Sequence, residues 1–439
     1  MTYSSWGRYP KSTPLAVYRV DWTDEDLPTG SCSLLPYGNG RSYGDACLNS
    51  SGALLDMRGL DRVLSFDRST GVLRCEAGIL LSDILSLVVP MGWFLPVTPG
   101  TRFVTVGGAI ANDVHGKNHH CAGTFGQHVL RLALRRSDRG VVLCSCTENA
   151  DLFQATVGGL GLTGAILWAE IQLKPIANPA VDYETIRFAN LDAFFELSED
   201  SDQDYEYTVA WIDCLAHGKS LGRGLFMRGN HASPREKLPL PPPKAHTFPV
   251  DPPLPLVNAW SLRVFNSLYY HKQISTVHRA VAHYETFFYP LDGILYWNRL
   301  YGRRGFLQYQ CVVPPESARD SVRALLEAIA AARDGSFLSV LKVFGDRRSP
   351  GLLSFPRPGT TLALDFPNRG RSTLKLLDRL DEIVASSGGA VYPAKDARMS
   401  GENFQQYFPR WKQFQHHIDP RFSSSFWRRV TETSPCATS

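Results

Sequence analysis

The 439-residue sequence has no hydrophobic run long enough to cross a bilayer, and its first 13 residues lack the apolar core of a signal peptide. Its nine cysteines include no CxxC pair, the spacing typical of zinc ribbons and redox disulfides. A net charge of +4 is too small for a concentrated basic face, so we expect no nucleic-acid partner. We therefore expect a cytoplasmic protein, and peripheral association with the inner membrane surface stays open.

Several common catalytic motifs are also missing. The sequence has no Walker A loop and no GxSxG elbow, which argues against a P-loop nucleotidase and an α/β-hydrolase. What the sequence does have is an ordinary globular composition, with 44% hydrophobic and 20% charged residues and 36 glycines. At this length, two or three compact units are expected.

The first third of the chain has short strand and helix patterns between glycines. Strands are predicted at 54–56, 72–77, 141–146 and 165–174, and helices at 82–89 and 151–156. A further strand is predicted at 208–214. This order lacks the regular βαβ repeat of a doubly wound sheet, so the class predicted is α+β.

A proline-rich segment at 233–255 interrupts the pattern, with nine of the 29 prolines. It cannot form a helix or a central strand, and it is either a linker between domains or a mobile flap over an active site. Beyond it, helices are predicted at 274–289, 316–333 and 374–386, and strands at 305–313, 337–344 and 361–366. These elements favour a second α+β domain on an antiparallel sheet.

Three glycine-rich segments are candidates for a ligand site. PYGNGRSYGD (36–45) can turn its backbone N–H groups toward one point, as an anion nest for a pyrophosphate does, although an ordinary tight turn fits as well. PGTRFVTVGGAIAN (99–112) offers hydroxyls and lets a flat ring approach the backbone closely. It leads into HGKNHH (115–120), where His115 and His119 stand i, i+4, but Gly116 and the single nearby carboxylate, Asp113, argue against a metal site.

The third segment, GGLGLTG (158–164), contains a literal GxGxxG. A Rossmann site needs a strand before this motif and a helix after it. Here a predicted helix precedes it and a predicted strand follows, so the context argues against NAD binding.

Together these segments resemble the FAD-binding domain of the vanillyl-alcohol oxidase (PCMH-type) superfamily. Further matches single out its decaprenylphosphoryl-β-D-ribose 2′-oxidase family, flavoenzymes of arabinan precursor synthesis for the cell envelope. The matching sequences are GRSYGD (40–45), HGKNHH (115–120), TVGG (156–159), GFLQYQ (305–310) and AKD (394–396). The resemblance covers about residues 30–430.

The resemblance implies a two-part FAD-binding domain and a substrate domain. Residues 1–178 would form the first part of the FAD domain, 179–389 the substrate domain with its antiparallel sheet, and 390–439 a segment that returns to the FAD domain. The implied cofactor-binding residues are Gly38, Asn39, Gly40, Arg41, Ser42, Tyr43, Gly44, Gly100, Thr101, Thr105, Gly107, Gly108, Ala111, Asn112, His115, Gly116, Gly159, Gly161, Gly164 and Tyr392.

The resemblance also implies where the chemistry takes place. Lys395, Tyr43 and His115 would be catalytic, and Lys395 would stabilise the negative charge that develops during alcohol oxidation. The implied substrate-binding residues are Lys117, Trp211, Tyr301, Gln308, Gln310, Lys342, Thr361 and Ala363.

The implied reaction is oxidation of the 2-hydroxyl of a pentose on a polyprenyl phosphate. Oxygen or a quinone would accept the electrons, and a nicotinamide-dependent reductase would complete an epimerisation. Two alternatives stay open: oxidation of a small free sugar, alditol or aldonolactone, and a flavin-binding scaffold without turnover.

Four residues bear on cofactor attachment and substrate choice: Arg41, which differs from many members of the superfamily, and Thr361, Ala363 and Val209, which differ from the narrower family. Arg41 stands where many relatives carry the His that bonds the flavin covalently, so the FAD should be non-covalent. Thr361 and Ala363 replace an Asn and a Cys, and Val209 replaces a Ser. The reaction type should survive these changes, but we expect the preferred substrate to differ.

Overall fold

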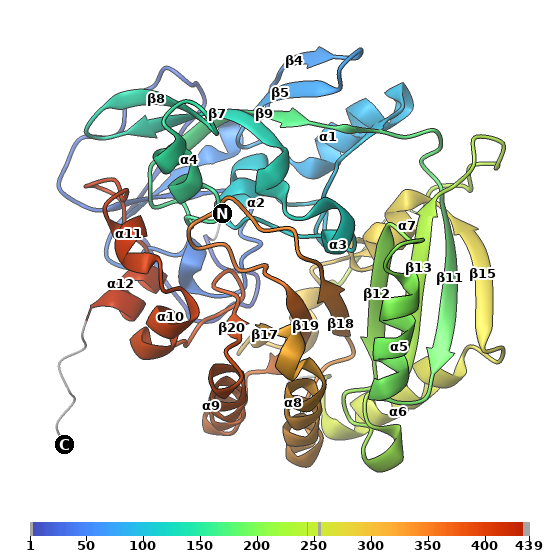
Figure 1. The fold of residues 1–439 in the computed structure, drawn as a ribbon. Coiled ribbons are helices and arrows are strands. Elements are labelled where there is room, and N and C mark those ends of the chain that lie inside the picture. Colours follow the sequence, from blue (N-terminus) through green and yellow to red (C-terminus); the bar gives the residue numbers. More distant parts are fainter. Residues whose placement is uncertain (1–2, 244, 253–255, 433–439) are drawn as a thin grey trace, which may run out of the picture.

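The computed structural model describes residues 3–243, 245–252 and 256–432. Residues 244 and 253–255 of the expected proline-rich loop, and 433–439 of the expected C-terminal segment, lie outside the described residues. Two groups of sheets face each other, one built by the N-terminal third and one by the middle of the chain (Figure 1). No helix among the described residues is long and apolar enough to span a membrane.

The N-terminal third forms a parallel sheet of three strands and an antiparallel sheet of five. The first has the order β1-β3-β2, and the second the order β4-β5-β9-β7-β8. The strands are β1 (Ala16–Arg19), β2 (Leu34–Tyr37), β3 (Ala53–Asp56), β4 (Val63–Asp67), β5 (Val72–Glu76), β7 (Val129–Arg136), β8 (Gly140–Ser145) and β9 (Ala165–Gln172). A two-stranded sheet joins β6 (Trp93–Phe94) to β10 (Lys174–Pro175).

Four helices accompany these sheets: α1 (Leu81–Val88), α2 (Val106–Ala111), α3 (His119–Ala122) and α4 (Ala150–Thr156). In α1 the apolar residues at i, i+3, i+4 and i+7 are buried, as the sequence pattern predicts. The predicted strands and helices of this third are confirmed within a few residues. The α+β class is confirmed as well.

The middle of the chain forms an eight-stranded sheet in which every neighbouring pair is antiparallel. Its order is β15-β11-β13-β12-β18-β19-β17-β20. The strands are β11 (Val181–Phe188), β12 (Tyr207–Ile212), β13 (Gly224–His231), β15 (Val277–Ala282), β17 (Phe306–Val313), β18 (Ser339–Phe344), β19 (Gly359–Pro367) and β20 (Ala390–Val391).

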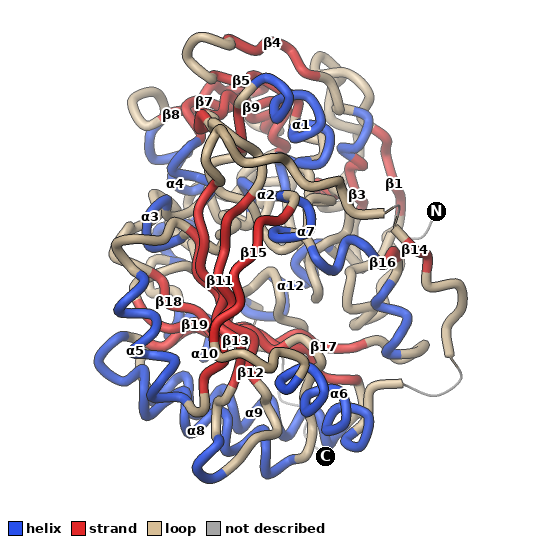
Figure 2. Tube along the Cα trace, turned by 90° about the vertical axis from the view of Figure 1, so that its right-hand side faces the viewer, coloured by secondary structure: helices blue, strands red, loops and turns tan. Residues whose placement is uncertain are grey.

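Helices cover this sheet unequally. On one face lie α5 (Leu191–Ser201), α8 (Ala318–Ala332) and α9 (Arg371–Ser386), whose apolar residues share one core cluster with Ala210, Leu362 and Leu364. The other face turns toward the N-terminal sheets, and α6 (Ala259–His271) lies along that side (Figure 2). Because strand residues alternate between faces, the neighbours of the core residues point away from α8 and α9.

The C-terminal segment returns to the N-terminal third. It contains α10 (Gly401–Tyr407), α11 (Trp411–Gln415) and α12 (Ser425–Thr431). The Arg429 guanidinium lies 2.7 Å from the Asp45 carboxylate and 2.9 Å from that of Asp396. These two ion pairs connect the loop after the GNGRSYG segment to the AKD segment.

One sequence prediction in the middle of the chain is wrong, and one helix was not predicted. Residues 274–289 do not form one helix: they form β15, which pairs with β11 along the sheet edge, and then the short helix α7 (Tyr284–Phe288). Tertiary pairing here overrides a local pattern that fits either structure. The helix α6 was not predicted.

The proline-rich segment is not a linker between separate units, because it joins β13 to α6 beside the same sheet. Its described residues are mostly exposed. Within it, β14 (His246–Thr247) pairs with β16 (Ile294–Leu295), and Arg8 forms an ion pair with Asp251. The segment therefore lies against the strand at 294–295.

Candidate functional site

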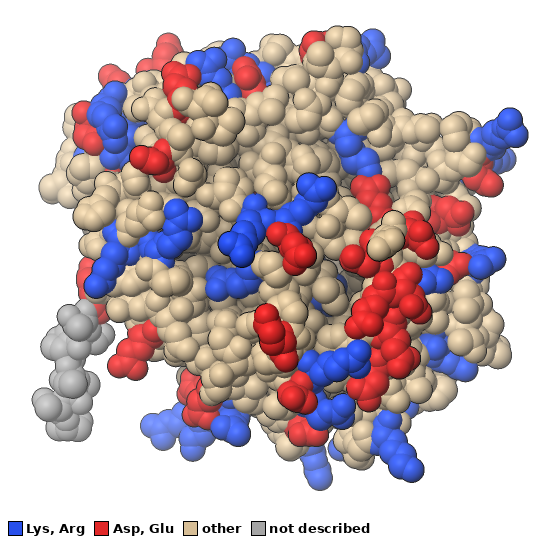
Figure 3. All heavy atoms as spheres, viewed as in Figure 1, with Lys and Arg blue, Asp and Glu red and all other residues tan. Residues whose placement is uncertain are grey.

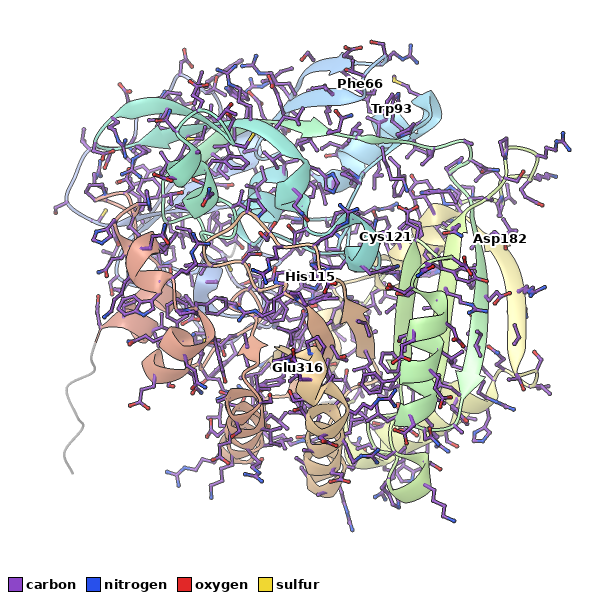
Figure 4. The ribbon with its side chains drawn as sticks, in the orientation of Figure 1. Phe66, Trp93, His115, Cys121, Asp182 and Glu316 are labelled. Atoms are coloured by element: carbon purple, nitrogen blue, oxygen red, sulfur yellow. The ribbon has the colours of Figure 1, made fainter. Side chains whose placement is uncertain are left out.

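A cavity of about 520 Å³ lies between the N-terminal sheets and the eight-stranded sheet. All three glycine-rich segments contribute to its wall. The opposite wall consists of strand residues that point away from α8 and α9, namely Val209, Trp211, Gln308, Gln310, Val340, Lys342, Thr361 and Ala363. His115 lies between these two layers (Figure 4).

The GNGRS loop presents free backbone N–H groups to this cavity. Within the described residues, none of the N–H groups of 39–42 donates a hydrogen bond to the protein. Gly40 has φ +60°, a left-handed conformation that favours glycine, and a Cβ on Gly38 would lie 2.4 Å from Thr105 Oγ1. The Asn39 amide fixes the loop by donating to the Phe103 carbonyl at 2.8 Å. This geometry is suited to an anion.

Arg41 adds a full positive charge beside this loop. Its guanidinium stacks over the Trp6 ring, 4.0 Å from the centroid, and its Nε is buried without a hydrogen-bond partner. Burial lowers the pKa of Arg41, and the carboxylate of Asp292 acts in the opposite direction. A bound anion would supply the missing partner.

The other two glycine-rich segments form the floor around this loop. The lining residues that they contribute include Gly100, Thr101, Thr105, Gly107, Gly108, Ala111, Asn112, Gly161 and Gly164. Thr101 donates its hydroxyl to Asp292 at 2.7 Å, and Tyr392 donates to the Asn112 carbonyl at 2.7 Å. The floor is thus rich in glycine and alanine, which leaves space for a flat ring.

Lys395 and Tyr43 meet at the centre of the cavity wall. Lys395 Nζ lies 3.8 Å from the centroid of the Tyr43 ring. Burial lowers the pKa of Lys395 to about 7, although the nearby Asp365 carboxylate partly offsets this effect. Asp365 accepts a hydrogen bond from the Gln308 amide at 2.7 Å, and burial raises its pKa to about 7. Lys395 is therefore poised to hold or release a proton near neutral pH.

His115 is a second polar group at this wall. The Gln310 amide lies 3.0 Å from His115 Nε2 and 3.3 Å from Thr361 Oγ1. When the amide donates to Nε2, the ring proton is on Nδ1, which is buried and has no partner in the described residues. Burial first, and the Lys342 charge second, lower the pKa of His115 well below its usual range. His115 is thus a neutral ring with an unused donor.

Two more lysines contribute positive charge to the cavity. Lys117 Nζ donates to the Phe288 carbonyl at 3.1 Å, and Lys342 Nζ donates to the Gly116 carbonyl at 2.9 Å. Burial lowers the pKa of Lys117 to about 8, and burial with the Lys117 and Lys395 charges lowers that of Lys342 to about 7. Neither lysine forms an ion pair within the described residues.

Three residues expected at the site do not line the cavity. Tyr301 stacks on Phe306 behind the wall, with ring centroids 4.3 Å apart, and its hydroxyl lies 3.4 Å from Asp365. Gly44 and Gly159 are needed for close backbone packing: a Cβ on Gly44 would lie 1.6 Å from the Asp396 carbonyl oxygen, and one on Gly159 2.1 Å from that of Ala155. All other expected residues contribute to the cavity wall.

Several lining or supporting residues were not predicted from the sequence: Trp6, Tyr269, Asp292, Tyr296 and Asp365. Asp365 could have been found, because it stands i+4 from Thr361 and i+2 from Ala363 on a predicted strand and shares their face. Trp6 and Tyr269 carry no such signal.

These residues fit FAD on structural grounds. The unpaired N–H groups of 39–42 and the Arg41 guanidinium suit a pyrophosphate, and the glycine-rich floor leaves room for a flat ring. The buried donor on His115 needs an acceptor that the described protein does not supply.

Comparisons with known proteins agree with this geometry. Residues 29–145 match the FAD binding domain family. The chain is 37% identical to the decaprenylphosphoryl-β-D-ribose oxidase of Mycolicibacterium smegmatis, over 91% of this chain and 90% of that protein. It is 35% identical to an uncharacterised protein of Streptomyces coelicolor over 80% of this chain, and 36% identical to the L-gulonolactone oxidase of Mus musculus over 31% of each chain.

Proposed function

Because this chain belongs to the decaprenylphosphoryl-β-D-ribose oxidase family and is an FAD-dependent oxidoreductase, we propose that it oxidises the 2-hydroxyl of a pentose carried on a polyprenyl phosphate. The product is a 2-keto sugar. Oxygen or a quinone accepts the electrons, and a separate nicotinamide-dependent reductase converts the keto sugar to the epimer.

The observation that carries this proposal is the charge of the cavity wall. Lys117, Lys342 and Lys395 all line the cavity, and none forms an ion pair within the described residues. Desolvated cations without counter-ions are unfavourable, so an anionic ligand is expected to neutralise them. A neutral free sugar or alditol would not do this, whereas the phosphate of a lipid-linked sugar would.

We infer the domain roles from the residues that each part of the chain contributes to the cavity wall. We assign FAD binding to residues 1–178 together with the segment from 390, and substrate binding to 179–389. The GNGRS loop and Arg41 would hold the pyrophosphate, and the 99–112 and 158–164 segments would contact the flat ring. Oxidation to the keto sugar removes a hydride from the carbinol carbon and a proton from its hydroxyl. FAD, when bound, would supply the two-electron acceptor for the hydride, and the proton would pass to water.

The residues of the opposite wall have distinct roles in this proposal. Lys395, with a pKa of about 7, places a positive charge where negative charge develops. Tyr43 holds the lysine against its ring face, and Gln308 connects Tyr43 to Asp365. Gln310 orients His115, whose Nδ1–H is free to donate to a ligand oxygen. Lys117 and Lys342 would bind the substrate phosphate.

The test is anaerobic mixing of the holoenzyme with two matched substrates, a polyprenylphosphoryl ribose in detergent and free ribose, while the flavin absorbance is followed. The proposal predicts rapid bleaching with the phosphorylated substrate and slow or no bleaching with the free sugar. Equal bleaching by both would favour the free-sugar alternative, which the partial match to L-gulonolactone oxidase also suggests. Inorganic phosphate should compete with the lipid-linked substrate in the wild type and less in Lys342→Met.

A further inference from the structure

The helix α6 carries large apolar residues on its outer side as well as toward the protein, but only the inner ones are packed. Toward the protein, Leu262 and Asn266 are buried. The ring centroids of Phe265 and Phe337 are 4.7 Å apart, and those of Tyr269 and Trp211 are 4.6 Å apart. On its outer side Trp260 is 75%, Val264 40% and Leu268 68% exposed. An amphipathic surface helix would carry polar residues there, so this outer stripe needs a different explanation.

The stripe begins before the helix. Leu256, which precedes α6, is 48% exposed, and its N–H donates to the Leu300 carbonyl at 3.1 Å. We call Leu256, Trp260, Val264 and Leu268 the α6 patch. Its four members stand at every fourth position, so those on the helix form one row along it.

The charged residues of the segment that carries the α6 patch are all positive. The sequence from 252 to 284 contains no Asp or Glu. Arg263 and Lys272 are exposed and form no ion pair within the described residues. On the opposite face of the eight-stranded sheet, Asp and Glu gather over α5 and the turn that follows it (Figure 3). Lys272 Nζ also lies 3.5 Å from the centroid of the Tyr269 ring. A surface that combines exposed Trp and Leu with exposed cations suits an anionic lipid surface.

The α6 patch also lies beside an opening of the cavity. Ile294 and Tyr296 line the cavity and are themselves 43% and 51% exposed, so the cavity reaches the surface at β16. The inner face of α6 contributes Tyr269 to the same cavity. Val257, just before the helix, packs with Tyr301 and Trp297. The outer stripe and the opening thus belong to one continuous side of the molecule.

We propose that the α6 patch docks on an anionic lipid bilayer, with Trp260 and Leu268 inserted among the acyl chains and Arg263 and Lys272 against the headgroups. This orientation turns the opening at Ile294 and Tyr296 toward the membrane, and the acidic α5 face away from it. The docking rests on the exposed surface alone. Its use, transfer of a lipid-linked sugar from the bilayer into the cavity, rests on the proposed function.

The test is flotation of the holoenzyme with vesicles of phosphatidylcholine alone and of equal parts phosphatidylcholine and phosphatidylglycerol, without substrate. The wild type should float with the mixed vesicles and much less with the neutral ones. Trp260→Glu and Leu268→Glu should each weaken vesicle binding about tenfold or more, because each replaces an exposed apolar side chain that inserts into the bilayer by a charged one. The milder Leu268→Ser should weaken it in the same direction.

The matched control is Leu15→Glu, since Leu15 is 69% exposed beside β1 and outside the patch. It should bind vesicles like the wild type, and all variants should keep their flavin. The proposal is overturned if the wild type does not float, or if Leu15→Glu loses as much binding as Leu268→Glu. It is also overturned if light scattering shows a dimer that Leu268→Glu dissociates, because a second copy would then cover the patch.

The two proposals can fail separately. Flotation without flavin bleaching by a polyprenylphosphoryl pentose would leave the docking surface intact and refute the proposed substrate. Bleaching by that substrate in detergent without flotation would support the proposed substrate and refute the docking surface.

Discussion

Replacing Lys395 with Met tests the part of the site on which the chemistry depends most. The lysine Nζ lies 3.8 Å from the centroid of the Tyr43 ring, and the charge of the Asp365 carboxylate raises the pKa of the lysine. Met has a similar length and no charge, so the change removes the cation and keeps most of the volume. FAD should remain bound, because the GNGRS loop, Arg41 and the glycine-rich floor are untouched.

The expected loss follows from the electrostatic role. Removing one group that stabilises developing charge in a desolvated site commonly costs about 10²–10³ in rate, and we expect flavin reduction to slow by that amount. The pH dependence has a definite sign. The pKa of Lys395 is lowered to about 7, so its cationic form dominates below that pH and is lost above it. Wild-type reduction should therefore fall as pH rises through about 7.

The assay is anaerobic stopped-flow reduction over a pH series. Lys395→Met should be slow and independent of pH, whereas Lys395→Arg, whose charge persists at all these pH values, should show no fall above neutrality. Lys342→Met is the matched control: it removes another lysine with a pKa of about 7, and we expect weaker substrate binding with an unchanged limiting rate. If Lys395→Met reduces its flavin at nearly the wild-type rate, the lysine does not have this role.

Three further outcomes are expected. Acid precipitation should release all the flavin, because Arg41 cannot form the covalent bond that a His could; colour in the precipitate would contradict this. Gly44→Ala should destabilise the holoenzyme by about 3 kcal/mol or more in thermal unfolding, because its Cβ would lie 1.6 Å from a backbone oxygen. The control Gly293→Ala should change stability little, because no atom lies within 4 Å of the added Cβ. Thr361→Asn combined with Ala363→Cys should shift the preference among pentose substrates, which steady-state kinetics would measure. The same variant should bind thiol-directed covalent ligands at position 363, whereas the wild type should not, and the mass of the intact protein would show this.

Sequence patterns predicted much of this fold where local signals were strong. The helix at 81–88 and the strands at 306–313 and 359–367 have clear periodicities and agree with the structure. Residues 274–289 were misread because pairing with β11 at the sheet edge, which the sequence does not reveal, decides their structure. The helix α6 was missed for a related reason: it follows a proline-rich segment, and its apolar residues lie on both sides of a narrow polar row of Arg263, Ser267 and His271.

The site was predicted more fully on its cofactor side than on its substrate side. Glycine loops have a sequence signature because the backbone itself forms the wall, as at Gly38 and Gly40. Side chains such as Tyr269 and Asp292 reach the cavity only through tertiary packing, so no local pattern identifies them. Tyr301 was expected to bind substrate, but it stacks on Phe306 behind the cavity wall and does not line the cavity.

The most direct test of the proposed reaction uses polyprenylphosphoryl ribose labelled with deuterium at a single carbon. Because the proposal breaks the C2–H bond in the step that reduces the flavin, deuterium at C2 should slow anaerobic bleaching, and deuterium at C3 should leave the rate unchanged. Bleaching that is slowed by the C3 label, or no bleaching by this substrate at all, would contradict the assignment of the protein as an oxidase of the 2-hydroxyl of a lipid-linked pentose.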